Sequence, residues 1–161
     1  IRTTFIVGFP GEDEAAFQRL LDFLQEAQID RVGAFMYSRE KGTPAAEMPD
    51  QVPFRLKRER YDRLMRFQQP ISLTRNRLWV GRTMRVLIEG YSADGKYAIG
   101  RSHRDAPDVD GLVYVRGCTA SPGEFVEARI TDADVYDVWG EARSAHDASP
   151  TPQIGHAPTL R

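Results

Sequence analysis

Hydrophobic and polar residues follow two different periods along the chain, and the first pattern begins close to its start. Residues 5–7 form a short apolar run with β-branched members, which predicts a strand covered on both faces. Gly8, Pro10 and Gly11 then predict a tight turn. Because Gly8 carries no side chain, a ligand can approach the backbone there. Turns of this kind, between a strand and a helix, occupy the catalytic edge of many α/β folds.

A helix and a second strand follow this turn. The acidic residues 12–14 favour the first turn of a helix, because the helix macrodipole stabilises negative charge there. Apolar residues at helical spacing extend the predicted helix to residue 28: Phe17, Leu20, Leu21, Leu24 and Ala27. Residues 31–37 predict the second strand, which completes a βαβ unit with parallel strands. The polar loop over residues 38–53 leaves this strand at the same edge as Gly8 and could line a ligand site.

Residues 54–69 predict a second, strongly basic helix. Its apolar stripe consists of Leu56, Tyr61, Leu64 and Phe67, and its cations are Arg55, Lys57, Arg58, Arg60, Arg63 and Arg66. Pro70 is expected to break or kink the helix, since proline lacks an amide hydrogen and clashes with the preceding turn. The arginines are compatible with nucleic-acid binding, but Glu59 and Asp62 are interleaved with them. We therefore expect a solvated helix that connects two parts of the chain.

After Trp79 the period becomes that of strands. Five short strands are predicted, over residues 83–89, 97–101, 111–115, 125–130 and 136–140, with turn-rich breaks between them. Short strands without a helix predict a small closed β-barrel of the OB type. The expected fold class is thus α/β plus all-β, with divisions at residues 1–68, 69–142 and 143–161. The last segment is rich in proline, serine and alanine without periodicity, and we expect it to be disordered.

The composition restricts the class of protein. With 41% hydrophobic and 28% charged residues, the 161-residue chain is that of a soluble globular protein, and no apolar stretch is long enough to span a membrane. A single cysteine, Cys118, excludes an internal disulfide and is typical of a reducing compartment, so we expect a cytoplasmic protein. It also excludes an iron–sulfur cluster held by this chain alone, which needs several thiolates. Because the sequence begins at Ile1, inside a predicted strand, we expect it to be the C-terminal part of a longer enzyme.

The net charge of −1 conceals an uneven distribution. Residues 1–77 carry 13 Lys/Arg and 11 Asp/Glu, whereas residues 78–141 carry 7 Lys/Arg and 11 Asp/Glu. The predicted barrel is therefore acidic. Within it, Asp105, Asp108 and Asp110 lie close together without the spacing of a calcium-binding loop. We interpret them as a network within a turn or as a contact for a basic partner.

Two stretches of the predicted βαβ unit resemble a known enzyme superfamily. Residues 6–12, Ile-Val-Gly-Phe-Pro-Gly-Glu, resemble the glycine-proline-glycine turn near the end of the radical S-adenosylmethionine (SAM) barrel. Residues 35–38 and 42–46 are similar to the last barrel strand and exit loop of the methylthiotransferases in that superfamily. The resemblance implies that both strands lie against the adenosine of SAM, with cofactor contacts from Ile6, Gly8, Pro10, Phe35, Met36 and Tyr37. From the residues alone, the alternatives are an ordinary strand–turn–helix unit and aromatic side chains that only fill the core.

The predicted barrel resembles the TRAM domain of the same methylthiotransferases. Residues 100–102 (GRS) and 105–115 (DAPDVDGLVYV) carry this resemblance, and residues 133–140 (ADVYDVWG) strengthen it. Within the family, these motifs are similar to the branch that modifies an aspartate of small-subunit ribosomal protein twelve. The chain is therefore identified as a member of the methylthiotransferase family. The resemblance implies the last βαβ of a radical SAM (TIM-like) barrel, a connecting helix and a five-stranded OB-like TRAM barrel.

The resemblance implies a reaction that this chain cannot carry out alone. In the family, a four-iron–four-sulfur (4Fe-4S) cluster cleaves SAM to a 5′-deoxyadenosyl radical, which abstracts hydrogen from an unactivated carbon, and a second 4Fe-4S cluster delivers sulfur. The cofactors perform these steps while the protein orients them. The cysteine ligands of both clusters are expected before Ile1. We therefore expect no catalytic residue and no metal ligand in this chain, which would be inactive alone, and we interpret Cys118 as incidental.

Two classes of partner remain open. The first is the basic ribosomal protein twelve, which an acidic barrel attracts, with Arg101, Asp105, Asp108 and Asp110 as the expected substrate-binding residues. The second is RNA, bound by a transfer-RNA methylthiotransferase or by a TRAM module that contacts RNA or the ribosome without catalysis. An RNA-binding barrel should carry a basic face with aromatic side chains for stacking. The net acidic barrel favours the protein substrate, and we expect no membrane partner.

Overall fold

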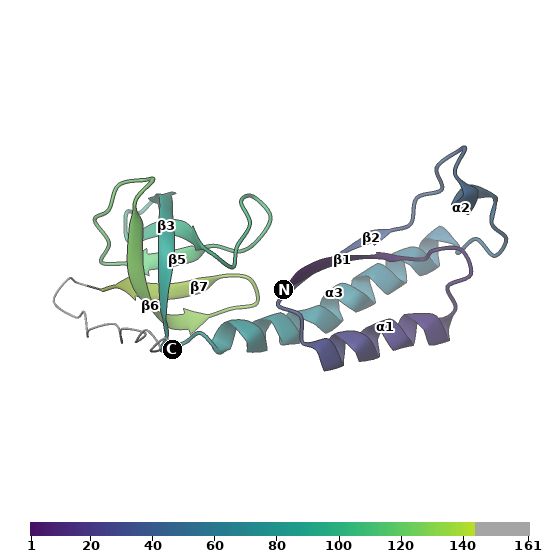
Figure 1. Ribbon diagram of the computed structural model, residues 1–161, viewed down its shortest axis with the longest axis horizontal. Coiled ribbons are helices and arrows are strands. Elements are labelled where there is room, and N and C mark those ends of the chain that lie inside the picture. Colours follow the sequence, from purple (N-terminus) through teal and green to yellow (C-terminus); the bar gives the residue numbers. More distant parts are fainter. Residues whose placement is uncertain (144–161) are drawn as a thin grey trace, which may run out of the picture.

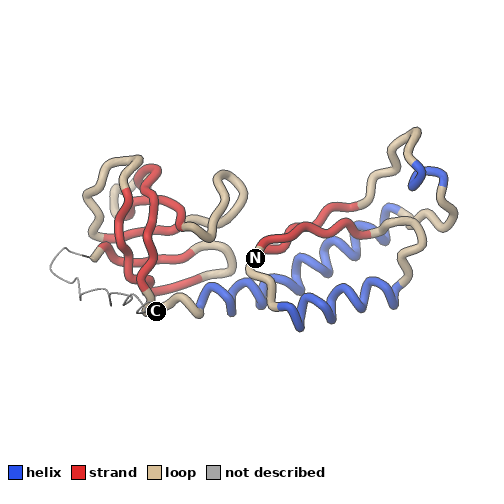
Figure 2. Tube along the Cα trace, in the orientation of Figure 1, coloured by secondary structure: helices blue, strands red, loops and turns tan. Residues whose placement is uncertain are grey.

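The computed structural model describes residues 1–143, in which an α/β unit is followed by a β-barrel (Figure 1). The first unit contains β1 (Arg2–Val7), α1 (Glu14–Ala27), β2 (Arg31–Met36), α2 (Pro44–Glu47) and α3 (Phe54–Arg77). The barrel contains β3 (Thr83–Tyr91), β4 (Tyr97–Ser102), β5 (Val113–Arg116), β6 (Phe125–Ala133) and β7 (Val138–Ala142). Figure 2 shows the helices gathered in the first unit and the strands of the barrel in the second. The segment that the sequence predicts to be disordered covers residues 143–161, and all of it except residue 143 lies outside the described residues.

β1 and β2 form the parallel pair that the sequence predicts. α1 joins them and begins after Asp13, whose carboxylate accepts a hydrogen bond from the Ala16 amide. α1 and α3 lie on the same side of the two strands (Figure 1). The core between helices and strands includes the fully buried Val7, Phe17, Leu24 and Leu64. The predicted βαβ unit is thus confirmed, with one face of its sheet packed on helices.

The long helix α3 differs from its prediction in length and in burial. It does not end at Pro70 but continues to Arg77. The reason is tertiary packing beyond the proline: Ile71 lies in the core, and the Asn76 amide donates to the carbonyl oxygen of Asp134 at 2.9 Å. These contacts outweigh the one backbone hydrogen bond that a proline removes. The predicted boundary between residues 68 and 69 falls inside this helix.

The barrel is closed and five-stranded, as the sequence predicts. Its strand order is β3-β4-β5-β7-β6, with β5 and β7 parallel and the other neighbours antiparallel. Each predicted strand range overlaps one observed strand. The barrel core is apolar and consists chiefly of Met84, Val86, Ile88, Val113, Val115 and Ile130. Before β5, a Cβ at Gly111 would collide with the carbonyl oxygen of Tyr136, so glycine is needed where these two loops meet.

Candidate functional site

The exposed face of the β1–β2 pair carries two of the predicted cofactor residues. Ile6 and Phe35 are partners in the register, and 57% and 67% of their surface is exposed. Because side chains alternate between the faces of a strand, they lie opposite the buried Val7 and Ala34, which pack toward the helices. The alternative interpretation of Phe35 as a core residue is therefore wrong. Parallel strands are usually covered on both faces, so this apolar pair offers a surface for a flat ligand or for another part of a protein.

Met36 and Tyr37 lie differently from Phe35. Met36 is half-buried and packs against the core on the helix side, as the core-filling alternative predicts. The half-buried ring of Tyr37 lies edge-on to the ring of Phe9, with their centroids 5.2 Å apart. Within residues 1–143 the Tyr37 hydroxyl has no hydrogen-bond partner. The three predicted cofactor residues of β2 and its exit therefore lie in three places: Phe35 on the exposed face, Met36 on the helix side and Tyr37 at the end of the sheet.

The turn after β1 is built against α3. Gly8 adopts a φ of 74°, which favours glycine, and the Lys57 side chain occupies the position that a Cβ on Gly8 would take. Helix packing therefore fills the space that the missing side chain leaves on that side, and approach of a ligand to the Gly8 backbone from another side stays a prediction. The Gly8 amide donates to Glu12 Oε1 at 2.9 Å, and Pro10 is buried in the same turn. Cofactor contacts of Gly8 and Pro10 stay predictions.

Arg31, at the start of β2, holds the barrel against the sheet. Its Nη2 lies 3.1 Å from Asp105 Oδ1 and its Nε lies 3.9 Å from Asp110 Oδ1. Asp110 also pairs with Arg2 at the start of β1. The side chains of Asp105 and Asp110 are only 6% and 8% exposed. The charges of these two predicted substrate-binding residues are therefore balanced within the chain.

Asp30 is a second centre of charge at this junction. Its carboxylate accepts hydrogen bonds from Arg75 Nε at 3.1 Å and Arg104 Nη2 at 3.2 Å. Burial raises the pKa of Asp30, whereas the hydrogen bond and the charge of Arg75 lower it. Burial, together with the charge of Arg31, lowers the pKa of Arg104. Both charge centres thus join the sheet, α3 and the barrel.

The remaining two predicted substrate-binding residues take no part in this network. On β4, Arg101 pairs with Glu89 on β3, with Nε and Oε1 2.6 Å apart. Asp108 is exposed with a φ of 59°, and no ion pair among residues 1–143 includes it. The structure brings Asp105 and Asp110 together through Arg31, but it does not join all four residues in one surface. Substrate contacts of the four stay predictions.

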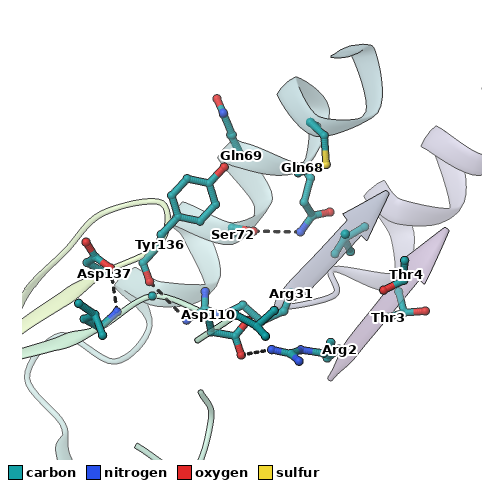
Figure 3. Close-up of a pocket in the computed structure, with 16 residues that line it drawn as sticks. Arg2, Thr3, Thr4, Arg31, Gln68, Gln69, Ser72, Asp110, Tyr136 and Asp137 are labelled. Carbon is teal, nitrogen blue, oxygen red and sulfur yellow. Dashed lines mark hydrogen bonds and ion pairs between the residues drawn. The ribbon is translucent and has the colours of Figure 1, made fainter. Parts of the chain in front are cut away.

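A cavity of about 550 Å³ lies at the junction, between the two strands, α3 and the barrel loops (Figure 3). Gln68 and Ser72 of α3 line one side, where Gln68 Nε2 donates to Ser72 Oγ at 3.1 Å. Arg31 and Asp110 line another side, and Tyr136 comes from the loop before β7. Gln68 Oε1 and Arg31 Nε are buried without a hydrogen-bond partner in the described part of the chain. Sequence reasoning missed this cavity because its residues lie far apart in the chain and show no common motif.

The barrel carries an aromatic surface that sequence reasoning also missed. The rings of Tyr114 and Trp139 are stacked at 5.4 Å and 11°, and Tyr97 lies edge-on to Tyr114. Arg116 lies over the Tyr97 ring at 5.4 Å and donates to its hydroxyl. A cavity of about 330 Å³ lies beside Tyr97, Trp139 and Arg116. The alternating positions on β4, β5 and β7 were the available signal, since they place these side chains on one face.

Within residues 1–143, no group of three or more His, Cys, Asp or Glu side chains is placed to hold a metal ion. The one cysteine of the chain, Cys118, is half-buried against the barrel core.

None of the described helices is both long and apolar enough to cross a membrane.

Comparison with known proteins connects both units to one group. A family model for the TRAM domain matches residues 80–142. Ribosomal protein uS12 methylthiotransferase RimO of Chloroflexus aurantiacus is 58% identical over 147 residues, which are 89% of this chain and 32% of that protein. The proteins of the same name from Roseiflexus sp. and Geobacter sulfurreducens are 56% and 54% identical, over 88% of this chain and 30% and 32% of their own lengths.

The chain thus spans about a third of the length of these curated relatives. The matched residues include the βαβ unit, α3 and the barrel, since they cover 89% of the chain. An identity above one half over such a length, together with the TRAM match, establishes common descent and a common fold of the matched part. Over these residues, the chain belongs to the RimO-type methylthiotransferase family.

Proposed function

We propose that these residues form part of a radical SAM enzyme that methylthiolates an aspartate of ribosomal protein uS12. The observation that carries this proposal is the identity of 58% to a protein named ribosomal protein uS12 methylthiotransferase. The activity belongs to the whole relatives, of which this chain spans about a third. The alternatives are a transfer-RNA methylthiotransferase and a TRAM module without catalysis.

The proposed role of the βαβ unit is to bind SAM, as the last such unit of a radical SAM barrel. When bound, SAM would supply the radical that abstracts hydrogen from the substrate, with the help of iron–sulfur clusters held elsewhere. The exposed Ile6–Phe35 pair supports this role, because an adenine ring packed on it would cover apolar surface. The main-chain atoms of Gly8 and Tyr37, at the ends of the two strands, would orient the adenosine.

The proposed role of the barrel is to contact the basic protein substrate. Asp105 and Asp110 contribute little to such a surface, because their charges are balanced by arginines. Asp108, Asp132 and Asp134 support the proposal better: they are exposed, and no ion pair among the described residues includes them. Exposed charges of this kind act chiefly on the rate of association. Arg101 is the remaining residue of the proposed substrate surface.

A second contact, with RNA, has a specific observation in its favour. Tyr97, Tyr114 and Trp139 form a half-exposed aromatic surface beside Arg116, and unpaired bases stack on such surfaces. The charge at this face is mixed, because Arg116, Asp132 and Glu141 all line the cavity beside these rings. We therefore include a ribosomal RNA contact beside the protein substrate.

The deciding experiment uses the longer enzyme that contains this chain, with its clusters reconstituted under anaerobic conditions. It is incubated with SAM, a low-potential reductant such as dithionite, a sulfide source and uS12, and the substrate is analysed by mass spectrometry. The expected result is the gain of one methylthio group on an aspartate of uS12. Modification of transfer RNA with unmodified uS12 would support the first alternative, and no modification of either would support the second.

A further inference from the structure

Two cations on α3, Lys57 and Arg60, are buried although they lie in a helix rich in exposed arginines. Their exposure is only 9% and 2%, whereas Arg55, Arg58 and Arg66 are exposed. Burial of a charge costs free energy unless it is paired and hydrogen-bonded. Arg60 Nε has no hydrogen-bond partner in the described residues, so the cost is not fully compensated. Stability alone would be served as well by apolar side chains at these positions.

Arg60 reaches the turn after β1 through Glu12. Its Nη1 donates to the Glu12 carbonyl oxygen at 2.9 Å and to Glu12 Oε1 at 2.8 Å. The same Oε1 accepts the hydrogen bond from the Gly8 amide. The guanidinium therefore fixes both ends of Glu12, and Glu12 fixes the direction of the Gly8 amide. Hydrogen bonds between charged groups of this kind are short and directional.

Lys57, one turn before Arg60, reaches the exits of both strands. Its Nζ donates to the Tyr37 carbonyl oxygen at 2.9 Å and lies 4.8 Å from the centre of the Tyr37 ring. Its aliphatic stem fills the space beside Gly8 where a Cβ would stand. The Tyr37 amide in turn donates to the Val7 carbonyl oxygen at 2.9 Å. One side chain thus sets the spacing between the end of β1 and the end of β2.

We propose that Lys57 and Arg60 are positioning residues for SAM, which act through Glu12 and the main-chain carbonyl groups of Gly8 and Tyr37, since the amides of both residues already donate to Glu12 and Val7. This inference rests on the proposed function, in which those main-chain atoms hold the adenosine. A ligand held by main-chain groups requires that their directions be fixed before it binds, because ordering them on binding reduces affinity. Helix α3 fixes these directions through the side chains of Lys57 and Arg60, and none of its own atoms contacts the ligand.

The test uses the reconstituted enzyme with Lys57→Met and Arg60→Met, which keep the aliphatic stems and remove the charged hydrogen bonds. Each change is expected to weaken SAM binding about tenfold, measured by calorimetry, which is the scale of one charge-assisted hydrogen bond. The KM for SAM should rise in parallel while the KM for uS12 stays constant. Arg66→Met is the matched control, because Arg66 is exposed on the same helix. Arg60→Lys should restore part of the affinity if Arg60→Met folds poorly.

A double-mutant cycle separates positioning from a general loss of stability. In a Glu12→Gln background, Arg60→Met is expected to have little further effect on SAM binding, because both residues act along one path. Hydrogen exchange of the Gly8 amide, measured on the reconstituted enzyme without SAM, should become at least about tenfold faster in Arg60→Met and unchanged in Arg66→Met. Equal weakening by Arg66→Met, or additive effects in the cycle, would overturn the inference.

The outcomes also distinguish this inference from the proposed function. If the wild-type enzyme binds SAM and the Lys57 and Arg60 variants bind it as tightly, the positioning role is wrong and the proposed function stands. If the wild-type enzyme with intact clusters does not bind SAM, the proposed function fails and the inference fails with it. Faster Gly8 exchange with unchanged SAM affinity would limit both side chains to a structural role.

Discussion

At the scale of single residues, Asn76 joins α3 to both the sheet and the barrel. It is fully buried near the end of α3, and its amide donates to the carbonyl oxygens of Asp134 and Val135 in the barrel. Its Oδ1 accepts from Arg31 Nη1 at 3.3 Å, which orients the arginine that pairs with the barrel aspartates. One neutral side chain therefore satisfies groups from the sheet and from the barrel.

Replacement of this side chain by Asn76→Ala is expected to lower the free energy of unfolding by about 2–3 kcal/mol, because two buried carbonyl groups lose their donor. Urea unfolding of the chain measures the change. The control is Thr74→Ala, since Thr74 is exposed and bonds only to Pro70 in its own helix. That control should change stability by less than about 0.5 kcal/mol. Similar effects of both changes would contradict the role given to Asn76.

At the scale of elements, α3 contains an energetic cost at Pro70 that packing compensates. Pro70→Ala is expected to raise the free energy of unfolding by about 1–2 kcal/mol, because the alanine amide can donate a helix hydrogen bond that proline cannot. This gain is larger than the stabilisation that is lost when proline no longer restricts the unfolded chain. Thermal or urea unfolding measures the gain. Arg66→Ala, an exposed change on the same helix, should have little effect. A loss of stability in Pro70→Ala would mean that neighbouring elements pack only against the proline-containing geometry.

The elements that could be predicted from the sequence are those fixed by local pattern. The alternating runs predict all five barrel strands, and the apolar run and helical spacing predict the parallel βαβ unit. The continuation of α3 past Pro70 could not be predicted, because contacts of Ile71 and Asn76 with distant segments decide it. The basic pattern of α3 predicts a solvated helix, but Lys57 and Arg60 are buried. Their hydrogen-bond partners, Tyr37 and Glu12, lie after β2 and β1, and the pattern of α3 alone does not contain that information.

At the scale of the whole molecule, the candidate site could be predicted in part. The turn at Gly8 and the strand at Phe35 lie at the same edge of the sheet, as a βαβ unit requires. The acidic loop is predicted to form a network within a turn or a contact for a basic partner. Asp105 and Asp110 accept hydrogen bonds from Ser102 and Ala106 within the turn and also face Arg31 and Arg2. Sequence charge counts do not contain this information, because they do not say which charges meet across two folded units.

The junction predicts that the two units unfold together. Arg31→Met should lower the free energy of unfolding by about 3–5 kcal/mol, because it leaves the nearly buried Asp105 without its arginine partner and Asp110 with Arg2 alone. Tryptophan fluorescence reports on Trp79 and Trp139 near the barrel, and circular dichroism reports largely on the helices. The unfolding curves from these two measurements should separate in this variant. Arg58→Met, which removes only an exposed pair with Asp62, should leave the curves superimposed. Superimposed curves for Arg31→Met would contradict the coupling.

Helix α3 also has a mechanical consequence. Its 24 residues extend over about 36 Å at ~1.5 Å per residue. Lys57 contacts the strand exits near one end, and Asn76 contacts the barrel at the other end. Pro70 is the one residue of α3 without an amide hydrogen, but Ser72 and Arg75 beyond it still bond to Asp30 beside β2. The helix is therefore fastened to the sheet unit on both sides of its weakest point, and the barrel is carried by a rod that is supported along its length.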